Sequence, residues 1–216
     1  MKKRYLLLSV LVMLGSAACV AWLQPRLPAS IPVHWNAAGE ADGFAGRAGL
    51  FVYTGLMALV IGLWWLMPRC SPRHYTVERF APTWWYGCLA LVCFIAYAQG
   101  IHAWAACDGG VDTARAMLVG MALLFAFTGN VMGKVRRNFW FGVRTPWALA
   151  SERVWYATHR LAARTMVAGA ALALLLLLAQ APHRLTVGVL ALALLLPAAW
   201  SLVYYKRLER SGRLEA

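Results

Sequence analysis

Six long apolar runs limit what this chain can fold into. None contains Asp, Glu, Lys or Arg, and they cover residues 5–23, 49–67, 83–106, 116–132, 165–180 and 187–205. Each is about as long as a helix that crosses a ~30 Å hydrocarbon core. The hydrophobic share is 62%, against about 45–50% in soluble domains. We therefore predict an all-α, polytopic membrane protein with six transmembrane helices, the first of them an uncleaved span rather than a signal peptide.

The positions of the basic residues predict how the spans are oriented. Four of the 21 Lys and Arg residues fall in one set of loops, and these are Arg26, Arg47, Arg115 and Arg184. All others lie at the termini, in residues 68–82 or in residues 133–164. Because cytoplasmic loops are enriched in Lys and Arg, both termini are predicted to be cytoplasmic. The predicted location is the bacterial inner membrane, crossed several times.

The net charge of +13 raises the question of nucleic-acid binding. The cations cluster at the ends of the apolar runs, where they meet anionic lipid headgroups, and do not follow one soluble face. We expect the lipid bilayer as a partner and no direct contact with nucleic acid. Homo-oligomers are compatible with the sequence.

The order of spans and loops divides the chain into three parts. Residues 1–68 hold two transmembrane helices and an outer loop, and residues 69–115 hold an inner loop and the third helix. Residues 116–216 hold three more helices, the basic inner loop 133–164 and a basic tail. Two polar residues near span ends, His102 and Asn130, are interpreted structurally: His102 as an interfacial residue and Asn130 as a hydrogen-bond partner of a neighbouring helix.

The basic inner loop combines cations with aromatic residues. The segment 138–144 is predicted to be a short re-entrant or surface element. Pro146 disfavours a helical backbone at Thr145, and a helix is predicted from Ser151, with Thr145 or Ser151 as its candidate N-cap. Glu152 and His159 are seven residues apart, so they share a face, which we interpret as a solvated face of a cytoplasmic helix.

The outer loop contains three metal-ligating residue types. His34, Glu40 and Asp42 suit a divalent cation such as zinc or manganese. The favoured alternative is an ordered loop, in which Gly39 and Gly43 occupy turns of positive φ and Asn36 and Asp42 bond locally to the backbone. No nucleophile–base set, phosphate-binding glycine loop or HExxH motif is present. We therefore predict a protein that is not an enzyme and has no metal or cofactor.

The two loops together resemble those of the SdpI family of bacterial membrane proteins. The outer segment matches LPxxIPxHWxxxGxxD over residues 27–42. The inner segment matches a second, more specific motif at Gly129, Asn130, Asn138, Gly142, Arg144, Thr145, Pro146, Trp147, Trp155, Thr158, His159 and Arg160. The resemblance covers residues 1–205 and implies a polytopic inner-membrane protein. The founding member of that family confers immunity to a secreted killing peptide and holds a transcriptional repressor at the membrane.

The resemblance implies candidate binding residues on both faces. On the outer face, where a peptide toxin would bind, they are His34, Trp35, Asn36, Gly39 and Asp42. On the inner face, where a cytoplasmic repressor would bind, they are Asn130, Asn138, Gly142, Arg144, Thr145, Pro146, Trp147, Trp155, His159 and Arg160. Two other functions stay open: a small-molecule permease in which Arg144 binds an anion, and a metal-dependent membrane enzyme that uses His34, Glu40 and Asp42.

Overall fold

The computed structural model describes residues 2–36, 40–72, 75–108 and 110–214. Its helices are α1 (Lys2–Leu23), α2 (Phe51–Leu66), α3 (Ala81–Asp108), α4 (Thr113–Met132), α5 (Pro146–Ala150), α6 (Glu152–Leu178) and α7 (His183–Arg210). Its strands are β1 (Ser30–Trp35) and β2 (Ala41–Gly46). Short 3-10 turns at Gln24–Arg26, Arg47–Leu50, Met67–Cys70 and Glu78–Phe80 flank the longer helices.

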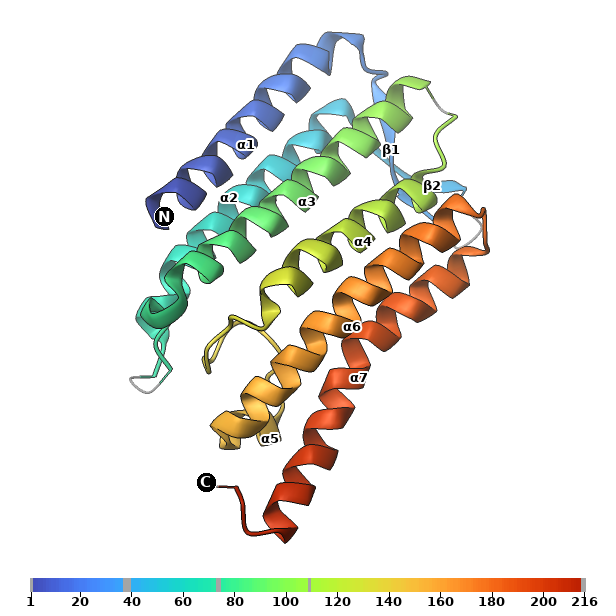
Figure 1. Cartoon of the computed structure of the whole chain (residues 1–216). Helices are drawn as coiled ribbons and strands as arrows, with labels where there is room; N and C mark the ends of the chain where they lie inside the picture. The colour runs from blue at the N-terminus through green and yellow to red at the C-terminus, as the bar shows by residue number, and fades with distance from the viewer. Residues whose placement is uncertain (1, 37–39, 73–74, 109, 215–216) are drawn as a thin grey trace.

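Six helices in the described part of the chain are long and apolar enough to cross a membrane. This confirms the predicted all-α, multi-pass membrane protein. Both termini lie at the end of the bundle opposite the β1–β2 hairpin (Figure 1). The fifth span starts earlier than predicted, because α6 is one continuous helix from Glu152. The segment assigned to the inner loop after Ser151 is therefore the first part of that span.

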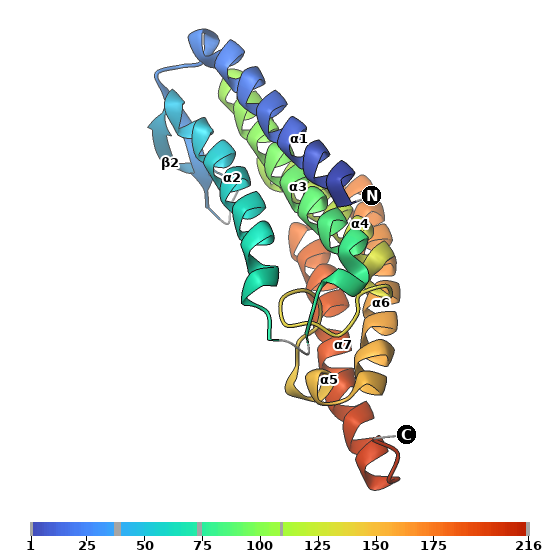
Figure 2. The same ribbon diagram turned by 90° about the vertical axis from the view of Figure 1, so that its left-hand side faces the viewer.

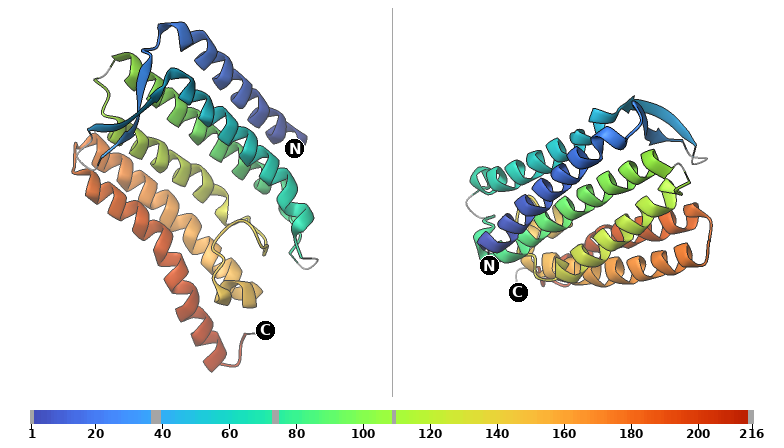
Figure 3. Two further views of the ribbon diagram at one scale, coloured as in Figure 1. Left: turned by 180° about the vertical axis from the view of Figure 1, so that it is seen from behind. Right: turned by 90° about the horizontal axis from the view of Figure 1, so that it is seen from above.

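The helices form two groups. Helices α1 and α2 pack against α3, while α6 packs against both α4 and α7. Figures 1 and 3 show the two groups side by side, joined where α3 meets α4. The largest hydrophobic core lies towards the inner end and includes Trp84 of α3, Val135 after α4 and Trp155 of α6. One core therefore links both groups near the inner loop.

The outer loop contains a hairpin that the sequence analysis did not predict. β1 and β2 pair antiparallel, with Ser30 opposite Gly46 and Ile31 opposite Ala45 (Figure 2). Ile31 is fully buried and anchors the hairpin on α1 and α3. Gly43 was expected at a turn of positive φ, and that prediction is wrong. Its Cα instead lies close to His34, whose Cβ would be 2.8 Å from an added Cβ.

Helix α7 bends in its middle (Figures 1 and 3), where Pro197 is buried inside the helix. Proline has no N–H, so the carbonyl of Ala193, four residues earlier, loses its helical partner. The Thr165 hydroxyl on α6 donates to this carbonyl at 2.8 Å. A freed carbonyl in a membrane needs such a partner, so Thr165 allows the bend.

Thr165→Val is expected to lower the free energy of unfolding by about 1–2 kcal/mol, because it leaves the Ala193 carbonyl without a partner. Thr128→Val is the matched control. The Thr128 hydroxyl donates within its own helix, to the carbonyls of Leu124 at 2.6 Å and Phe125 at 3.5 Å. Unfolding of the purified protein in detergent measures both effects. Equal losses in the two variants would contradict a special role for Thr165.

Helix α4 begins with a charged cap on the outer side. Asp112 accepts a hydrogen bond from the Arg115 backbone N–H at 2.9 Å and one from its Nε at 3.2 Å. Partial burial acts to raise the pKa of the Asp112 carboxyl, but these bonds and the nearby charges of His183 and Arg115 together hold that pKa below its usual range. The folded protein therefore favours the ionised carboxylate.

A carboxyl with a lowered folded pKa stabilises the protein above its unfolded pKa, and this contribution is lost as pH falls through the folded value. The contribution of the Asp112 carboxylate to the free energy of unfolding should thus be lost below about pH 4. Asp112→Asn keeps a capping oxygen but removes the charge. We expect the variant to be slightly less stable at neutral pH and to lose less on acidification. Parallel unfolding profiles for both proteins from pH 6 to 3 would rule this out.

Candidate functional site

Asn138 organises the inner loop between α4 and α5. Its side chain is fully buried, and its Oδ1 accepts the backbone N–H groups of Trp140 (2.8 Å) and Phe141 (2.7 Å). Its Nδ2 donates to the carbonyls of Arg136 (2.8 Å) and Phe141 (2.9 Å). All its main hydrogen-bonding positions are therefore used within the loop. Asn138 shapes the site and presents no free group to a partner.

Gly142 and His159 meet where this loop crosses α6. Gly142 has a φ of +110°, and an added Cβ would lie 2.2 Å from Nε2 of His159. The next residue, Val143, donates its backbone N–H to the same Nε2 at 3.0 Å. Only glycine combines this backbone conformation with such a close approach.

His159 is fully buried, so its assignment to a solvated face shared with Glu152 is wrong. Its Nδ1 bonds the carbonyl of Trp155 at 2.8 Å, so this nitrogen carries the proton and Nε2 is the acceptor for Val143. The imidazole stacks on the Trp155 ring, with centroids 4.0 Å apart. Trp155 in turn donates from Nε1 to the Val135 carbonyl at 2.9 Å. Both motif residues hold the loop on α6.

Of the two candidate caps for the predicted helix, Ser151 is the one that caps it, and Thr145 caps the separate short helix α5, which was not predicted. Thr145 caps α5 by accepting the Ala148 N–H at 3.2 Å, and Ser151 caps α6 by accepting the Val154 N–H at 3.5 Å. Pro146 and Trp147 open α5, and Pro146 occupies the first turn, where a missing N–H costs nothing. The Thr145 hydroxyl also bonds Ser201 of α7 at 2.7 Å. The loop is thus tied to α7 next to its bend.

Arg144 is exposed at the inner end of the bundle. One nitrogen of its guanidinium donates to the Phe139 carbonyl at 2.9 Å. Arg144 lines a cavity of about 530 Å³ between the two helix groups, together with Thr145, Phe141, Trp64 of α2, Met166 of α6 and Pro197 of α7. The cavity is mostly apolar and has one cation among its lining residues. This arrangement suits an apolar ligand that carries a negative charge.

The loop also contacts α3. The Phe141 ring lies edge-on to Trp84, with centroids 6.4 Å apart, and covers Gly87 so closely that its Cζ would be 3.2 Å from an added Cβ. Trp84 and Trp64 each donate from the indole N–H to the other's carbonyl, at 3.1 and 2.9 Å. This pairing of Trp84 with Trp64 was not predicted from the sequence.

Two further arginines of the loop bind aromatic residues. Arg136 donates to the Tyr156 hydroxyl at 2.7 Å, and this bond raises the pKa of the guanidinium. Arg137 lies over the Tyr75 ring at 5.7 Å. Arg160 is exposed on α6. Asn130 is also exposed and has no hydrogen bond from its side chain within the described ranges, so its predicted bond to a neighbouring helix is wrong.

The outer candidates form a separate cluster on the hairpin. His34 and Asp42 are exposed, and Nδ1 of His34 is hydrogen-bonded to the Asp42 carboxylate at 2.5 Å. The Asn36 amide bonds the Glu40 carboxylate at 3.1 Å, and Gly39 lies outside the described residues. Within the described ranges, no three His, Cys, Asp or Glu side chains are close enough to hold a metal ion.

Trp35 connects the hairpin to the membrane helices. Its ring lies 4.8 Å from that of His102 on α3, and the ring of Tyr53 of α2 stacks on the His102 ring with centroids 5.3 Å apart. His102 is buried and bonds the Ala98 carbonyl at 2.7 Å. One turn below, Gln99 bonds the Leu50 carbonyl at 2.9 Å and also Ser16 of α1. The sequence places His102 near the outer end but does not indicate Trp35 as its neighbour.

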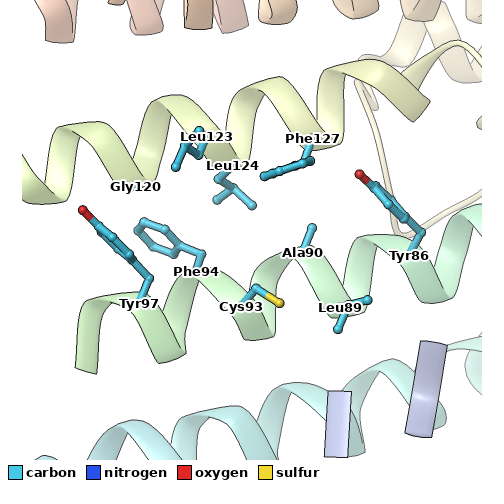
Figure 4. A pocket seen from close by; sticks show the side chains of 10 residues that line it. All are labelled: Tyr86, Leu89, Ala90, Cys93, Phe94, Tyr97, Gly120, Leu123, Leu124 and Phe127. Carbon is cyan, nitrogen blue, oxygen red and sulfur yellow. The ribbon is translucent and has the colours of Figure 1, made fainter. Parts of the chain in front are cut away.

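A second groove lies between α3 and α4, away from the motif residues. Figure 4 shows its side chains, with Tyr97 and Phe94 of α3 beneath Gly120 of α4. A Cβ on Gly120 would be 2.5 Å from the Tyr97 ring, so glycine permits this close packing. All its lining residues are uncharged. It provides apolar surface to the membrane rather than a site for a charged ligand.

Comparisons with known proteins match the parts of the chain that contain the hairpin and the inner loop. The SdpI/YfhL protein family matches residues 134–205, which include most of the inner site, and a domain of unknown function (DUF1648) matches residues 11–58, which include the hairpin. Immunity protein SdpI of Bacillus subtilis (strain 168) is 24% identical over 213 residues, 98% of this chain and 100% of that relative. The chain is thus similar to the SdpI family along residues 134–205, and to an SdpI immunity protein along nearly its whole length.

The two matched regions include the hairpin and the inner loop, which lie at opposite ends of the bundle. The first ends with the hairpin and the start of α2, and the second begins in the inner loop and runs into α7. The long helix α3 lies between them in the sequence and contacts both ends. No solved structure matches the chain.

Proposed function

We propose that this chain is an immunity protein of the bacterial inner membrane, which protects its cell against a secreted antimicrobial peptide and signals to a cytoplasmic partner. The observation that carries the proposal is the similarity to Immunity protein SdpI along 98% of the chain. The similarity is not confined to the apolar spans, since the matched regions include both polar sites.

The contacts of α3 support a role for the two sites in one pathway. At the outer end, Trp35 of the hairpin rests on His102 of α3. At the inner end, Trp84 of the same helix contacts Phe141 of the loop that presents Arg144. A peptide that displaces the hairpin would therefore act on α3, and α3 would act on the inner loop. The proposed partner on the cytoplasmic side is a repressor protein that binds this basic loop.

Survival of a peptide-sensitive bacterium tests the proposal. Cells that express the protein are expected to survive secreted membrane-active peptides at least tenfold better than cells without it. Arg144→Ala should remove this protection, because it deletes the cation at the cavity and leaves the buried contacts of Asn138 and His159 intact. His34→Ala should reduce protection by breaking the exposed His34–Asp42 pair.

Arg153→Ala is the matched control. Arg153 is exposed on the same face, does not line the cavity, and makes one long bond to the Arg213 carbonyl at 3.5 Å. Membrane abundance of all variants is measured beside survival. Full protection by Arg144→Ala at normal abundance would exclude the inner site from immunity. Absence of protection by the unmodified protein against every peptide would reject the immunity function itself.

The cavity supports a second candidate, a permease for an anionic small molecule. It lies between the two helix groups and has Arg144 at one side, where a guanidinium can bind a carboxylate or phosphate with two parallel bonds. Flux of labelled organic anions into proteoliposomes measures this activity. Uptake that Arg144→Ala reduces would favour the permease, and uptake equal to that of empty liposomes would exclude it for the anions tested.

A further inference from the structure

A groove between α6 and α7 faces outward at the inner half of the bundle. Its volume is about 640 Å³, and its walls include Arg160, Arg164 and Leu161 of α6, and Trp200, Val203 and Tyr204 of α7. It is separate from the cavity at Arg144, with which it shares no lining residue. The groove lies beside the bend at Pro197, where α7 changes direction.

The position of Arg164 along α6 places its backbone inside the hydrocarbon layer of the membrane. Helix α6 ends on the outer side at Leu178, and about 20 helical residues cross the hydrocarbon core. Counted back from Leu178, the inner edge of the core falls near His159. Arg164 is about 21 Å from the outer end, which places its Cα inside the apolar layer. A charge at this depth has to reach a polar partner at the interface.

Neither Arg160 nor Arg164 has such a partner among the residues that the structure describes. Both side chains are exposed, and neither makes a hydrogen bond or an ion pair with the described part of the chain. By contrast, Arg136 and Arg137 of the inner loop bind Tyr156 and the Leu149 carbonyl. The two arginines are four residues apart on one helix, so their guanidinium groups lie on the same face. Together they form an unpaired double positive charge.

Helix α7 forms the other wall of the groove, which is mostly apolar and lies opposite Arg160 and Arg164. Trp200 and Tyr204 stack with ring centroids 5.8 Å apart and an interplanar angle of 15°. Aromatic residues of this type mark the level of the lipid headgroups. The side chains of Leu161 and Val203 extend the wall. The groove therefore combines two cations near the headgroup level with a surface for an acyl chain.

We propose that this groove is a binding site for one anionic phospholipid, whose phosphate contacts Arg160 and Arg164 and whose acyl chain lies along Leu161 and Trp200. Charge selects the ligand class. A lipid with a net negative headgroup, such as phosphatidylglycerol, satisfies both guanidinium groups. The ammonium of a zwitterionic lipid is repelled by the same pair. The bound lipid fixes α6 against the bent half of α7, to which the Thr145–Ser201 bond also ties the inner loop.

Quenching of Trp200 fluorescence tests the site. The protein is reconstituted in phosphatidylcholine vesicles with a small fraction of spin-labelled phosphatidylglycerol or spin-labelled phosphatidylcholine. The same measurement on Trp200→Phe isolates the contribution of Trp200. Labelled phosphatidylglycerol is expected to quench Trp200 with about tenfold higher apparent affinity than labelled phosphatidylcholine, as two arginines near the surface imply. Arg160→Gln with Arg164→Gln should remove the difference.

Arg207→Gln with Arg210→Gln is the matched control, because these exposed arginines line a different groove at the end of α7. It should leave the lipid preference unchanged. Arg160→Lys with Arg164→Lys keeps both positive charges and should retain part of the lipid preference. This variant shows whether the glutamine pair acts by removing charge or by disturbing the fold. Equal quenching by the two labelled lipids in the unmodified protein would overturn the proposal. Equal losses in both glutamine pairs would also overturn it, by showing diffuse attraction to the surface. The outcome of this lipid-binding test is independent of whether the protein confers immunity.

Discussion

Gly142→Ala is expected to destabilise the protein by about 3 kcal/mol and to reduce its abundance in the membrane. Three effects add at this position. Alanine rarely adopts the φ of +110° that Gly142 has. Its Cβ would lie 2.2 Å from Nε2 of His159. Movement of His159 away from the new methyl group would break the bond from Val143 to Nε2.

Gly133→Ala provides the matched control for this substitution. Gly133 lies at the end of α4 with φ −66°, and a Cβ there meets nothing within 4 Å. Its replacement should be neutral or slightly stabilising. Unfolding in detergent and quantification in membranes compare the two variants. If both retained the stability of the unmodified protein, the close approach of Gly142 to His159 would be refuted.

A double variant separates the clash from the backbone strain. His159→Ala alone removes the acceptor of the Val143 N–H and leaves a cavity beside Trp155. In Gly142→Ala combined with His159→Ala, the methyl group has room but the positive φ remains unfavourable. The combined loss should therefore be smaller than the sum of the two single losses. Strict additivity would mean that the two residues do not meet.

The sequence alone predicts the spans and the helix caps well, because both follow from local chemistry. Apolar runs without charges of about 20 residues have few alternatives to membrane helices. Thr145 before Pro146, and Ser151 before a helical segment, are local signals that need no tertiary contact. The start of α6 was missed for a related reason. Arg160 and Arg164 are typical of a loop in a hydropathy profile, although they lie on the spanning helix itself.

The contacts that form the site could not be predicted in the same way. His159 has a polar side chain on a helix with charged neighbours, and nothing local indicates that Gly142 and Val143 cover it. The hairpin was missed because Pro32 weakens the strand pattern and the glycines of β2 favour loops. Trp35 and His102 are far apart in sequence, so their contact becomes evident only in the folded chain.

Asn138→Asp is expected to produce the second large loss, about 4 kcal/mol at neutral pH. The two side chains have nearly the same shape, so packing is preserved. The carboxylate can still accept the N–H groups of Trp140 and Phe141. On the other side, an oxygen replaces the amide that donates to the carbonyls of Arg136 and Phe141. Three oxygens then face one another around a buried negative charge.

The same substitution predicts a dependence on pH that a simple packing defect lacks. Burial and the facing carbonyls raise the pKa of the new carboxyl in the folded state above its unfolded value. The folded variant then binds a proton more tightly than the unfolded variant does, so its stability falls as pH rises between the two pKa values. Acidification from neutral pH should therefore restore part of the loss, because a protonated carboxyl can donate to one of the carbonyls.

Asn130→Asp is the control within the same motif. Asn130 is exposed at the inner end of α4, and its side chain makes no hydrogen bond within the described ranges. A carboxylate there stays solvated near a basic surface and should change stability by less than about 1 kcal/mol. Unfolding measured from pH 7 to 5 distinguishes the two positions. A loss for Asn138→Asp that is the same at every pH would show that its carboxylate reaches water, and that Asn138 is not the buried centre of this loop.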